Sequence, residues 1–146
     1  MKIAIINGPN LNMLGQREQE HYSNITYDQM IEEIDIYATS LNIEYIEYYQ
    51  SNHEGQIIDY IHQLVKDSFD ALIINPGAYS HYSIAILDAL LIFKGLKVEV
   101  HLSDVLNREE FRAKLITAKA CDYLISNKGV KGYLEGLKII HNNAKL

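Results

Sequence analysis

The chain has 146 residues, of which 48% are hydrophobic and 22% charged, and its formal net charge is −6. This length fits a single domain spanning residues 1–146, and the composition is that of a folded globular protein, which excludes a disordered chain. The acidic balance argues against a general nucleic-acid binder and against a membrane-surface protein, because both need a net positive surface.

Neither a secretion signal nor a membrane span is expected. Only four apolar residues follow Lys2, whereas a signal peptide needs about 7–15. The longest apolar stretch, Ile84–Phe93, is interrupted by Asp88 and is far shorter than the roughly 20 residues of a membrane span. The one cysteine cannot form an internal disulfide or a cysteine-rich zinc site. We therefore expect a cytoplasmic protein.

The first part of the chain predicts a strand, a helix and a second strand. The apolar run Lys2–Asn7 predicts a strand that ends before a glycine and a proline. After a long polar loop, Thr26 with Gln29 three residues later forms a capping-box pattern, which predicts the start of a helix. The run Ile43–Gln50 is rich in tyrosine and isoleucine and predicts the second strand.

The middle of the chain continues this alternation. Ser51 and Glu54 form a second capping-box pattern, which predicts that a helix begins there. Ala71–Asn75 predicts the third strand, His81–Phe93 a strongly apolar helix, and Lys97–Leu102 the fourth strand.

The last part predicts two further helices and one more strand. Asn107 and Glu110 have the spacing of another helix cap, Cys121–Ser126 predicts the fifth strand, and the last helix is expected over Val130–Asn143. Five strands that alternate with helices predict a parallel sheet covered on both faces. We expect an α/β protein, a flavodoxin-like three-layer sandwich with strand order 2-1-3-4-5.

Polar residues gather where four of the predicted strands end. They occupy residues 7–10, 51–55, 75–81 and 99–103. Ligands of such sheets bind beyond the carboxyl ends of the strands. Four separate segments would therefore meet at one edge, which predicts an active site there.

The chain has three arginines, all in segments that could reach this edge. Arg17 lies in the loop after the first strand, whereas Arg108 and Arg112 lie in the helix predicted after the fourth. The planar guanidinium suits recognition of carboxylate or phosphate, so the three favour a small anionic ligand. Solvated surface arginines are the alternative interpretation.

Glu99 and His101 are two apart on a predicted strand and should share one face. A carboxylate beside an imidazole fixes its tautomer and raises its basicity, as a general acid requires; the alternative is a structural pair at a sheet edge. His81 could bind ligand hydroxyls or be a polar helix end. A zinc site made of His53, His81 and His101 is conceivable, but neither histidine spacing nor a cysteine cluster supports it.

Tyr22 lies five residues beyond Arg17 in the loop after the first strand. A phenol with a pKa of about 10 is a poor base, but a nearby guanidinium could lower that pKa. The alternative is that Tyr22 only packs the loop down. Other schemes lack their motifs: the sequence has no phosphate-binding loop, no nucleophile elbow and no lysine in the four edge segments for a Schiff base. Cys121 is expected to be a buried apolar residue.

The edge segments contain a set of specific motifs. They are Asn-Gly-Pro-Asn-Leu-Asn-x-Leu-Gly-x-Arg-Glu at 7–18, Tyr22, Gln-Ser-Asn-His-Glu-Gly at 50–55, Asn-Pro-Gly-Ala-Tyr-Ser-His at 75–81, Glu-Val-His-Leu-Ser at 99–103 and Arg-Glu-Glu-Phe-Arg at 108–112. In this order and spacing, over nearly the whole chain, they resemble the type II 3-dehydroquinate dehydratases. The resemblance implies a flavodoxin-like hydro-lyase that converts 3-dehydroquinate to 3-dehydroshikimate, the third step of the shikimate pathway to chorismate and the aromatic amino acids. It implies no metal, no cofactor and no Schiff base.

The resemblance also implies catalytic roles. Tyr22 would be the base that takes a proton from the carbon next to the ketone. Arg17 would lower the pKa of Tyr22 and stabilise the transition state, and Asn10 would hold a water that stabilises the enolate oxygen. His101 would donate the proton to the departing hydroxyl, with Glu99 orienting it.

Substrate binding and assembly follow from the same resemblance. The backbone amides of Leu102 and Ser103, with the Ser103 hydroxyl, would bind the substrate carboxylate. The ring hydroxyls would be bound by three side chains, those of Asn75, His81 and Arg112. Asp88 would reach the site of a neighbouring subunit in a dodecamer of four trimers.

Two residues of the loop after the first strand depart from the family pattern. Gln19 stands where the family commonly has proline, and Ser23 stands where it has glycine. We expect residues 11–24 to act as a lid with Gly15 as a flexible point, and we expect the two changes to alter its closure rate and not the reaction. A Gln19→Pro variant should order the lid more readily.

Two alternative hypotheses stay open at this point. One is a flavodoxin-like module that binds flavin or a small anion without dehydratase activity; the residues at 8–11 are not the Ser/Thr-rich phosphate loop that a flavin site would favour. The other is a scaffold whose second strand is an edge, with Tyr45, Tyr48 and Tyr49 making subunit contacts, which is compatible with catalysis.

Overall fold

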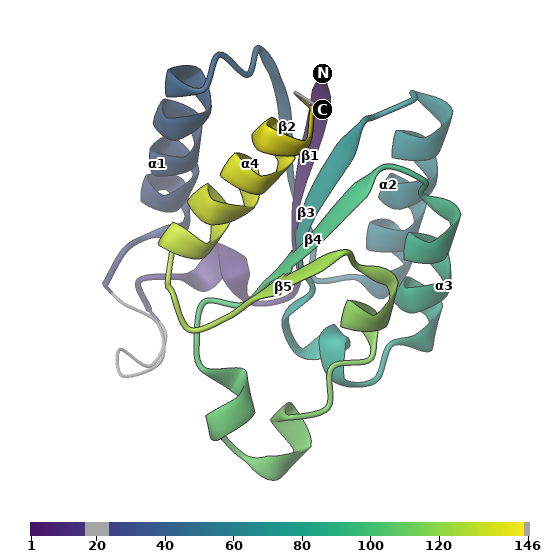
Figure 1. Cartoon of the computed structure of the whole chain (residues 1–146). Coiled ribbons are helices and arrows are strands. Elements are labelled where there is room, and N and C mark those ends of the chain that lie inside the picture. The colour runs from purple at the N-terminus through teal and green to yellow at the C-terminus, as the bar shows by residue number, and fades with distance from the viewer. Residues whose placement is uncertain (17–23, 145–146) are drawn as a thin grey trace.

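The computed structural model describes residues 1–16 and 24–144, and a five-stranded parallel sheet forms its centre (Figure 1). The strands are β1 (Lys2–Asn7), β2 (Tyr45–Gln50), β3 (Ala71–Asn75), β4 (Leu96–Val100) and β5 (Tyr123–Ile125). They lie in the order β2-β1-β3-β4-β5, which confirms the predicted order. Since every pair is parallel, all five carboxyl ends point to the same edge of the sheet.

Within the described residues, four α-helices cover the sheet. They are α1 (Tyr27–Ser40), α2 (Glu54–Lys66), α3 (Ile84–Ile92) and α4 (Lys131–Ala144). α1 and α4 lie on one face, and α2 and α3 lie on the other (Figure 1). The expected three-layer, flavodoxin-like architecture is therefore confirmed. None of the helices in this part of the chain is long and apolar enough to cross a membrane.

The core is divided by the sheet. Side chains alternate along β1, so Ile3 and Ile5 pack with α1 and α4, while Ala4 and Ile6 pack with α2 and α3. β3 is buried along its whole length. Strands covered on both faces need continuous apolar sequences, and β1 and β3 have them. This rigid centre holds the carboxyl ends of β1, β3 and β4 in fixed positions.

The capping box at Thr26 is confirmed. The Thr26 hydroxyl accepts a hydrogen bond from the backbone N–H of Gln29, and the Gln29 side chain accepts one from the N–H of Thr26, at 3.1 and 2.9 Å. The bounds of β1 and β3 agree with the predicted ranges. β2 and β5 begin two residues later than predicted, which places Cys121 before its strand, where burial raises the pKa of its thiol.

The second capping box is not formed. α2 does begin at Glu54, but its cap is His53, without a side-chain hydrogen bond. The Ser51 hydroxyl instead accepts from the N–H of His53 and donates to the Gln56 side chain. The Ser51 hydroxyl, which was expected to cap α2, therefore forms its hydrogen bonds within the short turn between β2 and α2.

The apolar helix begins three residues later than predicted, at Ile84 and not at His81. Residues Gly77–His81 form a separate 3-10 helix, and Ser83 caps α3 by accepting from the N–H of Ile86 at 3.0 Å. The extended backbone at Ser83 separates the two helical segments. His81 is therefore the end of a turn and not the start of a helix.

The helix predicted from Asn107 is wrong. The segment between β4 and β5 consists of three short 3-10 helices, at Val105–Asn107, Glu110–Arg112 and Thr117–Ala120. Leu106 and Phe111 are more than half exposed here, so a long helix over this stretch would lack the stability that a buried apolar face supplies. Arg108 and Arg112 consequently stand on turns.

Candidate active site

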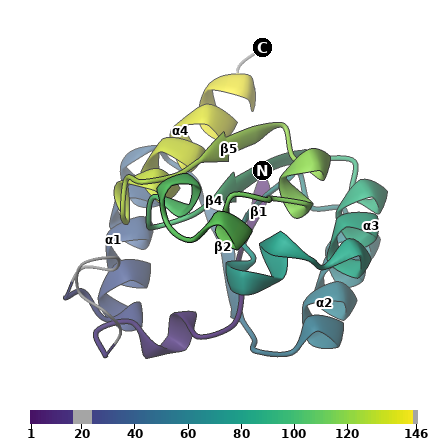
Figure 2. The same ribbon diagram turned by 90° about the horizontal axis from the view of Figure 1, so that it is seen from below.

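The carboxyl ends of the strands enclose a small polar pocket of about 130 Å³. It is lined by Pro9, Asn10, Leu11, Asn75, Gly77, Ala78, His81, His101, Leu102, Ser103, Val105, Arg108 and Arg112. Figure 2 looks onto this end of the molecule, where the green segment between β4 and β5 lies between the two helical layers. Of the four segments expected at this edge, those after β1, β3 and β4 line the pocket.

Glu99 and His101 form a buried pair at the end of β4. The Nε2–H of His101 donates to Oε2 of Glu99 at 2.7 Å, and both side chains are almost completely buried. Residues two apart share one face of the strand, as the sequence predicts. This bond leaves Nδ1 as the ring nitrogen available to a ligand in the pocket. The carboxylate can orient the ring and stabilise its protonated form.

The loops after β1 and β3 are packed backbone to backbone. The N–H of Gly8 donates to the Asn75 carbonyl at 2.8 Å, and a Cβ on Gly8 would lie 2.5 Å from the Pro76 carbonyl oxygen. In return, Gly77 has a φ of +59° and faces Pro9. Each glycine therefore gives room to the proline of the other loop. This contact fixes one wall of the pocket.

Asn10 continues that wall with a left-handed backbone. Its φ is 70°, a conformation that asparagine adopts more readily than most residues. The N–H of Asn10 donates to Oδ1 of Asn52 at 3.0 Å, which ties the loop after β1 to the loop after β2. Asn52 and its neighbours thus support the pocket without lining it.

The amide of Asn75 is held from two sides. Its Nδ2 donates to the Tyr133 hydroxyl at 3.1 Å, and its Oδ1 accepts from the N–H of Gly77 at 3.1 Å. Tyr133 lies on α4, is fully buried, and donates in turn to Oδ1 of Asn7 at 2.5 Å. Burial raises the pKa of Tyr133, so its hydroxyl keeps its proton. The sequence predicts only that Tyr133 lies on the last helix, and its pattern gives no sign of this bridge.

His81 presents a defined tautomer to the pocket. Its Nδ1 lies 2.9 Å from the carbonyl oxygen of Lys114, which can only accept, so Nδ1 carries the proton and Nε2 is the acceptor. Burial lowers the pKa of His81, partly opposed by this carbonyl, and the neighbouring His101 and Arg112 lower it further. A neutral His81 can accept a hydrogen bond from a ligand hydroxyl.

The cations come from the segment after β4. Arg112 donates from Nε to Oε2 of Glu109 at 2.6 Å, and Nη1 of Arg108 lies 3.4 Å from the Ser103 hydroxyl. A backbone N–H and the Arg112 guanidinium lower the pKa of Glu109. Two guanidinium groups at one pocket suit an anionic ligand.

Leu102 and Ser103 present backbone donors to the pocket. Their carbonyls accept from the N–H groups of Gly129 and Asn127, each at 3.1 Å. Within residues 1–16 and 24–144, neither N–H of the pair donates to another residue, so both can bind a carboxylate.

The remaining predicted residues divide into two groups. Arg17 and Tyr22 lie outside the described residues, as do Gln19 and Ser23 of the expected lid. Asp88 lies on the exposed side of α3 and does not line the pocket.

The described ranges contain no group of three or more His, Cys, Asp or Glu side chains that could hold a metal ion. His53, one of the three histidines of the conceivable zinc site, does not line the pocket.

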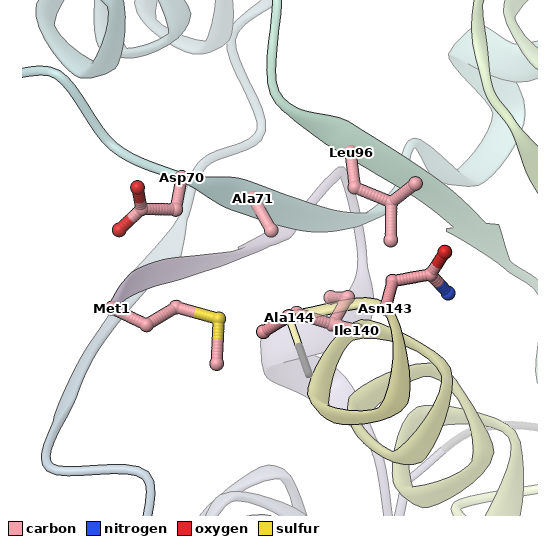
Figure 3. A pocket seen from close by; sticks show the side chains of 7 residues that line it. All are labelled: Met1, Asp70, Ala71, Leu96, Ile140, Asn143 and Ala144. Carbon is pink, nitrogen blue, oxygen red and sulfur yellow. The ribbon is translucent and has the colours of Figure 1, made fainter. Parts of the chain in front are cut away.

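A larger pocket, of about 440 Å³, lies at the opposite end of the sheet (Figure 3). It is lined by Met1, Asp70, Ala71, Leu96, Ile140, Asn143 and Ala144. Among the described residues of this lining, Asp70 is the only one with an acidic or basic side chain, and its carboxylate already accepts from the N–H of Lys2 at 2.6 Å. This pocket therefore offers little chemistry.

Comparison with known proteins finds similar sequences and structures over nearly the whole chain. The family model described as dehydroquinase class II matches residues 1–141. The 3-dehydroquinate dehydratase of Thermotoga neapolitana is 51% identical over 140 residues, 96% of this chain and 94% of that protein. That of Clostridium perfringens strain 13 is 48% identical over 145 residues, 99% of each chain. The crystal structure of type II dehydroquinase from Butyrivibrio crossotus superposes with a TM-score of 0.93 at 48% identity, covering 96% of this chain and 97% of that one.

Proposed function

The chain belongs to the class II dehydroquinase family and catalyses the dehydration of 3-dehydroquinate to 3-dehydroshikimate, and we propose that Tyr22 is its base and His101 its acid. The observation that carries the assignment of the acid is the buried Glu99–His101 pair facing a pocket with guanidinium and amide donors. Elimination of a hydroxide needs such an acid, because hydroxide is a poor leaving group at neutral pH.

The first step forms an enolate. The Tyr22 phenolate takes the proton from the carbon next to the ketone, and the electrons of that C–H bond move into the enolate. Arg17 favours the phenolate form, and Asn10 holds the water that donates to the enolate oxygen. Tyr22 and Arg17 lie outside the described residues, so their roles rest on the sequence resemblance.

The second step expels water. As the enolate collapses, the new carbon–carbon double bond forms and the bond to the β-hydroxyl oxygen breaks. That oxygen takes a proton from His101 and leaves as water. Glu99 supports this step because a carboxylate stabilises the imidazolium that must donate.

The substrate is held by groups on both sides of the pocket. The backbone N–H groups of Leu102 and Ser103, which have no acceptor among residues 1–16 and 24–144, bind its carboxylate together with the Ser103 hydroxyl. The ring hydroxyls are bound by Asn75, His81 and Arg112. The Nε2 acceptor of His81 and the second amide hydrogen of Asn75 are suited to hydroxyl groups.

The assembly that we propose is the dodecamer of four trimers, in the cytoplasm. The exposed side of α3 supports it, because Ile84, Leu91 and Ile92 are each at least half exposed there, around Asp88. A second copy that covered this face would bury apolar surface and bring Asp88 to a neighbouring pocket. Sedimentation velocity of the purified protein tests the assembly, and a monomer would contradict it.

The experiment that tests the catalytic roles is ultraviolet absorbance after chelator-treated protein is added to 3-dehydroquinate. The conjugated enone of the product absorbs where the substrate does not. We expect a rise that survives chelation and borohydride and that collapses in Tyr22→Phe and His101→Ala. The matched control is His141→Ala, which removes a histidine near the opposite end of the sheet. Retained activity in either site variant would contradict the role of that residue.

A further inference from the structure

Thr117 makes a buried hydrogen bond to the carboxylate of the proposed acid pair. It begins the 3-10 helix Thr117–Ala120, and its side chain is fully buried. Its hydroxyl donates to Oε1 of Glu99 at 2.5 Å, while Oε2 of the same carboxylate accepts from His101 at 2.7 Å. Each carboxylate oxygen therefore has its own donor. Thr117 does not line the pocket.

We infer that Thr117 is a positioning residue for the proposed general acid, acting on His101 through Glu99. The inference rests on the proposed function of His101, since a positioning residue has an effect only if the group it positions takes part in the reaction.

The geometry of the carboxylate explains why a second donor matters. A single hydrogen bond would leave the Glu99 carboxylate free to rotate about its last torsion, which is broad in proteins. Donors on both oxygens fix its plane and, with it, the direction of the imidazole that bonds to Oε2. Glu99 is fully buried, so a lost donor would not be replaced by bulk water.

Thr117 is itself held in place by its neighbours. The N–H of Ile116 donates to the Ser80 carbonyl at 2.7 Å, and the Thr117 carbonyl accepts from the Cys121 thiol, with sulfur and oxygen 3.8 Å apart. The helix Thr117–Ala120 also packs against α3. The hydroxyl thus belongs to a rigid part of the fold, joined to the turn that carries His81.

Other charged and titratable groups also face the pair. Lys97 lies on the same face of β4, and its ammonium donates to the Phe93 carbonyl at 2.6 Å. His81 and Arg112 approach from the turns after β3 and β4, and the Cys121 thiol lies beside Thr117. None of these four is bonded to Glu99 in the described part of the chain. They act on the pair at longer range than the Thr117 hydroxyl.

The deciding variants are Thr117→Val, which has nearly the same shape without the hydroxyl, and Thr117→Ser, which keeps it. In Thr117→Val the carboxylate loses a donor, binds a proton more strongly and competes with the imidazole for the proton that the reaction needs. We expect kcat to fall about 10-fold, a part of what a general acid contributes. We expect the alkaline limb of the kcat–pH profile to move to higher pH, because the pair as a whole holds its proton more tightly. Thr117→Ser should restore both.

The control is Tyr60→Phe, which removes a different hydroxyl-to-carboxylate hydrogen bond, from Tyr60 to Glu47 at 2.8 Å, and keeps the aromatic ring. It measures the effect of a stability loss alone, so its pH profile should keep the parental shape. If Thr117→Val lowers the unfolding temperature but leaves the profile unchanged, Thr117 is only structural and the inference is wrong.

Two further measurements keep the test decisive. If Thr117→Val does not fold, Thr117→Cys, which keeps a weaker donor, should show a smaller shift of the same limb, and a parental profile would overturn the inference. In a Glu99→Gln background, Thr117→Val should lose most of its effect on kcat. Full activity of His101→Ala would instead contradict the proposed acid itself, which distinguishes the two failures.

Discussion

A pocket of about 440 Å³ at the amino end of the sheet contrasts with the polar pocket of about 130 Å³ at the carboxyl end. The larger is lined mainly by apolar groups and one carboxylate that is already hydrogen-bonded. The smaller gathers two histidines, two arginines and two asparagines. The loops that leave the strands before each helix meet only at the carboxyl end, so strand direction decides where these polar groups come together.

The largest expected effect on kcat comes from removing the charge of the Glu99 carboxylate at the carboxyl end, compared with the same change at Asp70 at the amino end. Glu99→Gln keeps the shape of the side chain but can no longer stabilise an imidazolium on His101, so kcat should fall about 100-fold. Asp70→Asn makes the same chemical change at the amino end and should leave kcat unchanged. Steady-state kinetics of both variants measures the contrast. Equal values of kcat in the two variants would show that the charge of Glu99 does not contribute to catalysis.

Arg112 tests whether the carboxyl-end pocket recognises its ligand through planar donors. Arg112→Ala should raise KM about 10-fold with a smaller change in kcat, because a charge-assisted hydrogen bond to the substrate is lost. Arg112→Lys keeps the charge and should recover only part of the affinity. Isothermal titration with the product checks whether affinity falls in the same order, from the parent to Arg112→Lys to Arg112→Ala. Full recovery by lysine would mean that only the charge counts.

The amino-end pocket should respond in stability and not in activity. Leu96 is partly buried at its rim, and Leu96→Ala should lower the free energy of unfolding by about 1–2 kcal/mol through lost apolar contact. Urea denaturation measures this loss, while kcat and KM should keep their parental values. A change in KM would mean that the two ends are coupled through β4, which would break the contrast.

The smallest expected effect concerns pH and His81. Because burial holds its pKa below the ordinary value of 6.5, the folded protein binds fewer protons there than the unfolded chain does. The contribution of His81 to stability therefore falls as the pH drops through 6.5 toward the lowered pKa. The parent and His81→Asn should therefore differ less in unfolding midpoint at mildly acidic pH than at neutral pH. If the midpoints of the two proteins plotted against pH gave parallel curves, this expectation would be contradicted.

Sequence patterns predicted those parts of the molecule that depend on neighbouring residues. Apolar runs gave β1 and β3, and the capping box at Thr26 marked the start of α1, because both signals act within a few positions. Ser51 has the same pattern as Thr26 but bonds elsewhere. The pattern alone could not show which of two local hydrogen bonds would form.

The parts that were missed depend on distant partners. Thr117 lies 18 positions from Glu99, and Tyr133 lies 58 positions from Asn75. Neither sequence separation corresponds to a helix or strand period. In the sequence, neither residue differs from one that is simply buried in the core. The cap pattern at Asn107 predicts a helix where the structure has turns, because the pattern does not show that Phe111, which follows it, stays exposed. Glu99 and His101 were found because two residues on one strand face need only local geometry.

The reciprocal contact between Gly8 and Pro76 has a consequence for redesign of the substrate range. A Cβ on Gly8 would lie 2.5 Å from the Pro76 carbonyl oxygen, so no larger residue fits at position 8 while the two loops keep their contact. Room for a bulkier cyclic hydroxy acid therefore cannot be made by shifting this backbone contact without moving the ends of β1 and β3 apart. Variation has to begin on the facing wall, where Arg108 and Arg112 stand on short turns outside the sheet. The glycine–proline wall then serves as the fixed reference against which a new ligand is fitted.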